Sequence, residues 1–154
     1  IMLKHLVLNY SYILICSSIF VWVNIFIAQY ILHMVPCEIC YIERGPWVLL
    51  FILGLFSIFK KHNYIYLLSI ITLISSILLS IFHSGVERGF WVSPFKSCQQ
   101  TVQNFSSLLT PGVPTKPCDM ANHYIIPYIS MTELGGIFAL FILLLLLISH
   151  LKSL

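Results

Sequence analysis

The sequence predicts an all-α membrane protein, a bundle of four transmembrane helices with two loops on the extracytoplasmic side. Only 8% of the 154 residues are charged, whereas soluble domains carry about 25%. The mean hydropathy is +0.96, and a soluble fold of this length has too little interior to hide so much apolar surface. Four long apolar runs alternate with polar segments. The length fits a single integral membrane domain over residues 1–154.

The first apolar run lies between Leu6 and Pro36 and contains no Lys, Arg, Asp or Glu. A helix needs about 20 apolar residues to cross the bilayer core, so we expect one over about residues 10–32. A cleaved signal peptide is the alternative, but its apolar region spans only about 7–15 residues. The greater length of this run favours a transmembrane helix.

The other three apolar runs predict helices over about residues 41–59, 64–83 and 131–149. The second run reaches bilayer length only if it begins near Tyr41, which leaves two charged residues at the level of the lipid headgroups. The third run is uncharged. The fourth is preceded by Ser130 and Glu133, whose spacing is that of a capping box at a helix N-terminus.

The polar segments between these helices form two loops, residues 33–45 and 84–130, on one side of the membrane. Lys and Arg favour the cytoplasmic side, but here they divide equally between the two sides. Lys60 and Lys61 lie in the shortest connection, where the rule is strongest, and all five acidic residues lie on the loop side. We therefore expect cytoplasmic termini and, in a bacterium, periplasmic loops, in a compartment where disulfides persist.

Five cysteines divide into two populations. Cys37, Cys40, Cys98 and Cys118 lie in the polar loops, which points to disulfide or thiol chemistry. Cys16 lies inside the first apolar run, and we expect it to be a small packing residue.

The stretch PCEICYIERG places a Cys-x-x-Cys motif at the start of the second helix. Such a motif often holds one reactive thiolate. Arg44 follows Cys40 by four residues, so both lie on one face if the helix begins near Cys40. A cation there would favour the Cys40 thiolate. His83, at the end of the third apolar run, is expected on the same side of the membrane.

Cys98 and Cys118 are expected to form a second disulfide, which would constrain the unfolded chain by roughly 3 kcal/mol. A purely structural staple is the alternative to a redox role. The proline-rich stretch PGVPTKPC predicts a mobile loop, which favours a disulfide that reaches a partner. Between the two thiols, TVQNFSSLL has apolar residues at helical spacing. It predicts a short amphipathic helix that either lies on the membrane surface or packs on the bundle.

Another class of function is compatible with the cysteines. The four loop cysteines have the ligand chemistry of a structural zinc site, so the chain could be a non-catalytic scaffold whose outer loops are held by disulfides or zinc. The small net charge of +3 and the lack of a long basic run disfavour nucleic-acid binding. No phosphate-binding loop and no His-Glu-x-x-His motif occur.

Taken together, these motifs resemble the DsbB family of bacterial disulfide bond formation proteins. The resemblance rests on Cys37-x-x-Cys40 after the first helix and on Arg44, four residues later. It also rests on His83, Gly85 and Glu87 after the third helix, and on Cys98 and Cys118 in the second loop. It extends over nearly the whole chain. A quinone reductase of the vitamin K epoxide reductase type resembles the chain less, because its Cys-x-x-Cys lies late in the sequence.

The resemblance implies a quinone-dependent thiol oxidoreductase. A DsbA-like periplasmic dithiol protein would attack Cys98, and electrons would pass from the Cys98/Cys118 pair to the Cys37/Cys40 pair. Cys40 would then meet a membrane quinone, ubiquinone or menaquinone. Arg44 and His83 would line the quinone head group.

Overall fold

The computed structural model describes residues 2–59, 63–94, 118 and 128–151, with side chains from residue 10 onward. Its helices are α1 (Met2–Phe26), α2 (Glu38–Phe59), α3 (Asn63–Glu87) and α5 (Met131–Leu151), and a short π-helix, η1 (Ile27–Ile31), continues α1. Each of the four α-helices is long and apolar enough to cross a membrane, the first together with η1. No strand occurs among the described residues. The predicted fold class is therefore confirmed, while the predicted surface helix lies outside the described residues.

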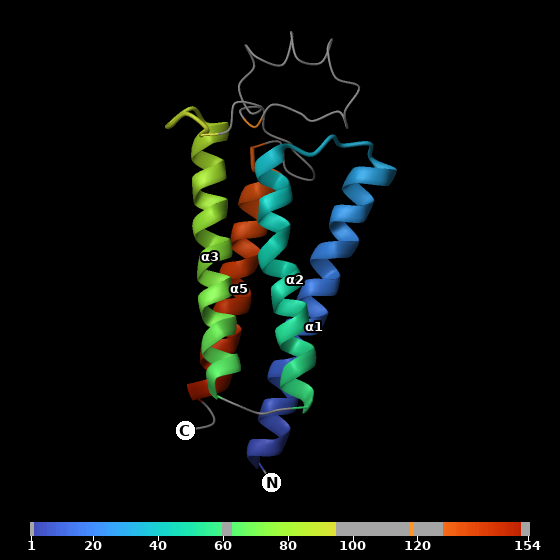
Figure 1. Ribbon diagram of the computed structural model, residues 1–154, viewed down its shortest axis with the longest axis vertical. Coiled ribbons are helices and arrows are strands. Elements are labelled where there is room, and N and C mark those ends of the chain that lie inside the picture. Colours follow the sequence, from blue (N-terminus) through green and yellow to red (C-terminus); the bar gives the residue numbers. More distant parts are fainter. Residues whose placement is uncertain (1, 60–62, 95–117, 119–127, 152–154) are drawn as a thin grey trace.

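The helices form an elongated bundle in which α1 packs on α2 and α3 packs on α5 (Figure 1). α2 also contacts α3, which joins the two pairs. The N-terminus of α1 and the C-terminus of α5 lie at one end of the bundle. The N-termini of α2 and α5 lie at the other end, together with the C-terminus of α3. The sequence motifs of interest therefore converge on that second end, called here the cysteine end.

Two helices extend further toward the cysteine end than the sequence predicts. α2 begins at Glu38, three residues before the predicted start, so Cys40 lies inside its first turn. α3 continues to Glu87 and encloses His83, which the hydropathy pattern had placed at the membrane edge. Gly89, with φ of 73°, then ends α3. Its N–H donates to the Val86 carbonyl, an arrangement typical of a Schellman cap.

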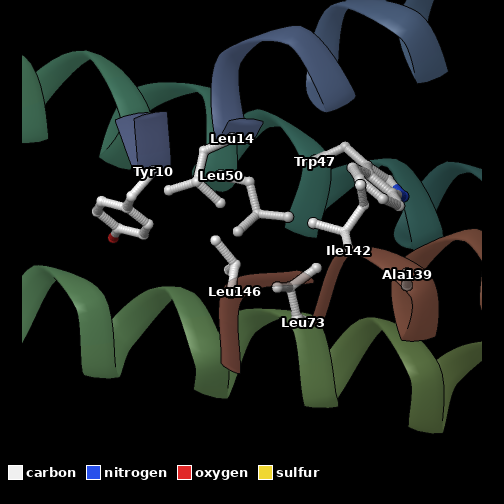
Figure 2. Close-up of a cluster of buried hydrophobic side chains, with 8 residues drawn as sticks. All are labelled: Tyr10, Leu14, Trp47, Leu50, Leu73, Ala139, Ile142 and Leu146. Atoms are coloured by element: carbon white, nitrogen blue, oxygen red, sulfur yellow. The ribbon is translucent and has the colours of Figure 1, made fainter. Parts of the chain in front are cut away.

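The centre of the bundle is filled by apolar side chains from all four helices (Figure 2). They are Tyr10, Leu14, Trp47, Leu50, Leu73, Ala139, Ile142 and Leu146. Small hydroxyl residues lie between the helices, as is common where membrane helices approach closely. The Tyr10 hydroxyl, for example, hydrogen-bonds Ser69 Oγ at 2.8 Å. The large apolar residues on the outside of the bundle leave a surface suited to lipid.

Cys16 does not belong to this core. Its side chain is exposed on the outside of α1, so the expectation that it packs between helices is wrong. Nearly every position of α1 is apolar, so helical periodicity distinguishes no apolar face. The face of α1 that points into the bundle was therefore not predictable from the sequence.

At the cysteine end, Glu133 fastens the start of α5 to the end of α3. The predicted capping box is confirmed, since Glu133 N–H donates to Ser130 Oγ and Ser130 N–H donates to a Glu133 carboxylate oxygen, both at 3.2 Å. The other carboxylate oxygen accepts from Arg88 at 2.6 Å and from Ser84 at 2.7 Å. These contacts of Glu133 with Ser84, Arg88 and Ser130, called here the Glu133 lock, hold the first turn of α5, including Thr132, against α3.

Two adjacent glycines in α5 offer a matched test of the α3–α5 packing. A Cβ on Gly136 would overlap the Ser80 side chain, whereas a Cβ on Gly135 would meet nothing within 4 Å. Ser80 also donates to the Thr132 carbonyl at 2.6 Å, so it cannot turn aside freely. We expect Gly136→Ala to destabilise the protein by about 1–3 kcal/mol. Gly135→Ala should leave stability unchanged or raise it by up to about 1 kcal/mol through helix propensity.

Thermal unfolding in detergent, followed by circular dichroism, measures both glycine variants. Equal shifts of the melting temperature in the two variants would contradict this packing of α3 against α5.

Candidate functional site

The site is built around a disulfide between Cys37 and Cys40 at the N-terminus of α2. Cys37 directly precedes the helix, and its Sγ accepts a hydrogen bond from the Cys40 backbone N–H at 3.2 Å. This is the bond that an N-cap side chain makes. A helix N-terminus carries partial positive charge, which stabilises an anionic sulfur. The Cys-x-x-Cys spacing thus places both sulfurs where thiolates are favoured.

The two sulfurs of this disulfide face different surroundings. Cys37 is only 3% exposed and belongs to a buried cluster at the cysteine end. Cys40 is half-buried and lies on the wall of a pocket. The disulfide therefore connects the buried cluster to the pocket.

The buried cluster brings the second loop to the first. Its core consists of Cys37, Ile39, Val86 and Cys118. Cys118 is 1% exposed and is itself disulfide-bonded. Cys98 lies outside the described residues, so the Cys98–Cys118 pairing stays a prediction. The structure nevertheless places a cysteine of the second loop in the same buried cluster as Cys37, which the sequence alone did not predict.

His83 is buried at 1% exposure and lies against Cys37. Its Nε2 is 3.3 Å from Cys37 Sγ. Its Nδ1 is 3.1 Å from a Glu43 carboxylate oxygen and 3.1 Å from Thr132 Oγ1. Glu87 Oε1 lies 3.8 Å from Nε2, beyond hydrogen-bonding distance. Three helices, α2, α3 and α5, thus surround one imidazole with polar groups.

Glu43 and Thr132 belong to this surrounding although no sequence motif indicated them, and Glu87 was indicated only as part of the family resemblance. Spacing offered a partial signal, since Glu43 follows Cys40 by three residues and Glu87 follows His83 by four. Both intervals place side chains on one helix face. Thr132 had no such signal, because its place beside His83 depends on the packing of α5 against α3.

A pocket of about 560 Å³ lies between the helices near the cysteine end. Its polar wall is formed by Cys40, Glu43, Arg44, Glu87 and Thr132, among others. The remaining wall is largely apolar and aromatic, with Phe20, Trp47, Phe138 and Phe141. The pocket therefore suits a ring-shaped apolar molecule with a few polar atoms at one edge.

Arg44 shares the pocket wall with Cys40, as their spacing predicts. The guanidinium is half-buried and lies over the Tyr41 ring, 4.5 Å from its centroid, in a cation–π contact. Within the described part of the chain Arg44 has no ion-pair partner. His83 lies behind this wall, against Cys37, and its predicted contact with a quinone head group stays a prediction.

The alternative of a structural zinc site can be compared with this geometry. Ligand atoms of Cys37, Cys40 and His83 lie within 4.8 Å of one another. Zinc binds cysteine as the thiolate, whereas these two sulfurs are bonded to each other. The disulfide form of the site therefore offers zinc only the imidazole.

Comparison with known proteins identifies the family. The family model described as disulfide bond formation protein DsbB matches residues 9–149. A protein of Rickettsia prowazekii (strain Madrid E) named "Uncharacterized protein RP370" is 36% identical over 102 residues, which cover 65% of this chain and 58% of that protein. The match thus spans less than two thirds of the relative's length. No solved structure shows a significant match. With the family model covering nearly the whole chain, this protein belongs to the DsbB family of disulfide bond formation proteins.

Proposed function

We propose that the protein re-oxidises a soluble, DsbA-like dithiol protein and passes the two electrons through two cysteine pairs to a membrane quinone. One observation carries this proposal. The Cys37–Cys40 disulfide lies between a buried cluster that holds Cys118 and a pocket lined by Cys40 and Arg44. Electrons that enter through the second loop would therefore arrive in the cluster that contains Cys37, whose disulfide partner Cys40 lines the pocket.

The pocket residues fit a quinone head group. Aromatic side chains such as Trp47 and Phe138 can pack against a flat ring, and Arg44 can donate hydrogen bonds to a ring oxygen. Because the four helices are of membrane-spanning length, an isoprenoid tail could extend into lipid. When bound, the quinone supplies the oxidising power by taking up two electrons and two protons. Ubiquinone and menaquinone share this chemistry.

Electrons move from the partner to the Cys37/Cys40 pair by successive thiol–disulfide exchanges. The partner thiolate attacks Cys98, which breaks the Cys98–Cys118 bond and releases the Cys118 thiolate. The Cys118 thiolate attacks Cys37 Sγ, so that a Cys37–Cys118 bond forms and Cys40 leaves as a thiolate at the helix N-terminus.

The second partner thiol then displaces Cys98, which leaves the partner oxidised. The freed Cys98 attacks Cys118 and restores the loop disulfide. Cys37 and Cys40 are left reduced beside the pocket. Each step exchanges one sulfur–sulfur bond for another, and two electrons in total reach the Cys37/Cys40 pair.

Energetics explain why a quinone is required. DsbA is a strong oxidant with a potential of about −120 mV, and for two electrons each 30 mV corresponds to about 1.4 kcal/mol. A protein disulfide alone has little driving force to re-oxidise such a partner repeatedly. A cation at the pocket wall would stabilise negative charge as it develops on the acceptor. The presence of Arg44 on the pocket wall supports this role.

We further propose that the protein lies in the bacterial inner membrane with its cysteine end in the periplasm and both termini in the cytoplasm. Support comes from the bundle itself, in which the N-terminus of α1 and the C-terminus of α5 lie at the end opposite the cysteine end (Figure 1). The oxidising periplasm is the compartment where a DsbA-like partner and persistent disulfides occur.

The decisive experiment measures quinone reduction by the purified protein with a reduced DsbA-like donor. We expect turnover with the wild type and with Cys16→Ser, because Cys16 faces outward from the bundle. We expect no turnover with Cys98→Ser, which removes the entry thiol. An inactive wild type with several quinones and donors would contradict the proposal. A non-catalytic scaffold with structural disulfides would then be favoured.

A further inference from the structure

Two features of His83 and Glu43 remain unexplained by the electron route. His83 is buried against Cys37 and is not among the residues that line the pocket. Glu43 lines the pocket and contacts His83 through one oxygen, while its other oxygen, Oε1, is buried and has no hydrogen-bond partner among the described residues. Buried polar atoms are rarely left unpaired. The two residues therefore call for a shared explanation.

The contacts around the imidazole assign its tautomer. Thr132 Oγ1 lies 3.5 Å from Glu87 Oε1, at the outer limit of a hydrogen bond in which the hydroxyl donates, and this leaves the hydroxyl oxygen as the acceptor towards His83. The Glu43 carboxylate, when ionised, is also an acceptor. Both neighbours of Nδ1 are thus acceptors, which places the hydrogen on Nδ1. The Nε2 lone pair then faces Cys37 Sγ at 3.3 Å.

This is the geometry of an activated nucleophile, in which a base contacts the sulfur and a third group orients the base. We propose that Cys37, His83 and Glu43 form a proton relay that carries the Cys37 hydrogen to the pocket. Its pocket end rests on the function proposed above, while the contact between Cys37 and His83 acts whether or not a quinone is bound.

The relay operates when the Cys37/Cys40 pair is re-oxidised. Cys37 gives its proton to His83 Nε2, and the sulfur–sulfur bond between Cys37 and Cys40 forms as the cysteine pair loses two electrons to the quinone. His83 passes the Nδ1 proton to Glu43, which releases it from the pocket wall to the reduced quinone. The second proton, lost when Cys40 ionises, does not pass through His83. The balance is two electrons and two protons per disulfide formed.

The ionisable groups that face His83 from the surrounding helices define its electrostatics. Glu43 faces it from α2 and Glu87 from α3, while α5 contributes only the Thr132 hydroxyl.

Two arginines lie at the same end of the bundle. Arg88 is bound to Glu133 and is more than half exposed. Arg44 lines the pocket with Glu43 and has no ion-pair partner among the described residues.

The first test uses the reduced protein without quinone. Brief pulses of iodoacetamide at a series of pH values alkylate thiolates, and mass spectrometry counts the modification at Cys37. In the wild type we expect Cys37 to react well below the pH range of an ordinary thiol. In His83→Gln we expect the midpoint of Cys37 alkylation to move towards about pH 8.5. The rate of Cys37 alkylation near pH 6.5 should fall at least about tenfold.

An unshifted profile in His83→Gln would overturn the role of His83 as the base. Thermal unfolding of the oxidised variant checks that it folds. If His83→Gln does not fold, His83→Asn, whose smaller amide fits the same space, carries the same test. Because no quinone is present, this outcome does not depend on the function proposed above.

The second test separates orientation from proton transfer. In Glu43→Gln the amide carbonyl still accepts the Nδ1–H, but the side chain can no longer carry a proton. We expect its Cys37 alkylation midpoint to lie between those of the wild type and His83→Gln, while quinone turnover falls at least about tenfold. Wild-type turnover in Glu43→Gln would overturn the relay beyond His83. A wild type that reduces no quinone would instead refute the proposed function.

Discussion

Cys40→Ser is expected to lose quinone turnover by at least about 10³-fold and to accumulate a disulfide between Cys37 and Cys118. The loss follows because Cys40 is the sulfur of the pair that lines the pocket. The accumulation follows from the buried cluster, in which Cys37 and Cys118 pack together. Without Cys40, the free Cys37 thiolate has Cys118 as its neighbour, and it displaces Cys98 from the loop disulfide.

Peptide mapping under non-reducing conditions measures this accumulation. The linked peptide should contain Cys37 and Cys118, and Cys98 should become open to alkylation. The double variant Cys40→Ser/Cys118→Ser is the matched control and should give no such peptide. A Cys37–Cys98 link, or no link in Cys40→Ser, would show that Cys118 does not deliver electrons to the first loop.

The helical bundle was predictable because a membrane imposes simple rules. Hydropathy and length give the four spans, and the capping-box spacing of Ser130 and Glu133 gives the start of α5. The rules fail where helices extend past the apolar runs. α2 begins early because Cys37 acts as its N-cap, and α3 continues to the cap at Gly89. Neither signal appears in hydropathy.

The site was predictable only in the part that lies within one helix. Cys37, Cys40 and Arg44 follow one another on α2, and their spacing indicates a shared face. The contact of His83 with Glu43 joins residues 40 positions apart, and that of His83 with Thr132 joins residues 49 positions apart. Such contacts depend on how three helices are packed, and no local pattern encodes this.

In the proposed mechanism, electrons and protons leave Cys37 by different routes. Electrons would pass from Cys118 through Cys37 to Cys40, while the proposed relay would lead the Cys37 proton through His83 to Glu43. The Glu133 lock supports this separation, since it holds the first turn of α5 and with it Thr132 against His83. The Glu133 carboxylate thus contributes both to the packing of α5 on α3 and to the position of Thr132 beside His83.

Arg44→Ala is expected to raise the quinone KM roughly tenfold to a hundredfold. Hydrogen bonds to charged groups contribute about 1.5–3 kcal/mol, and each 1.4 kcal/mol is about tenfold in affinity. Arg44 shares the pocket wall with Cys40 and has no ion-pair partner in the part of the chain that the structure describes. Its charge is therefore available to a bound quinone oxygen. Steady-state kinetics at saturating reduced donor and varied quinone measure this KM.

Two further arginine variants distinguish binding from general effects of charge. Arg44→Lys retains the cation but loses the planar guanidinium, so we expect a smaller rise in KM. Arg88→Ala removes an arginine that is bound to Glu133 outside the pocket, so we expect a lower melting temperature with the quinone KM unchanged. If Arg44→Ala keeps the wild-type KM, then Arg44 does not contact the quinone. The acceptor would then be held by the apolar wall alone, and the cation would act only through its field on the Cys40 thiolate.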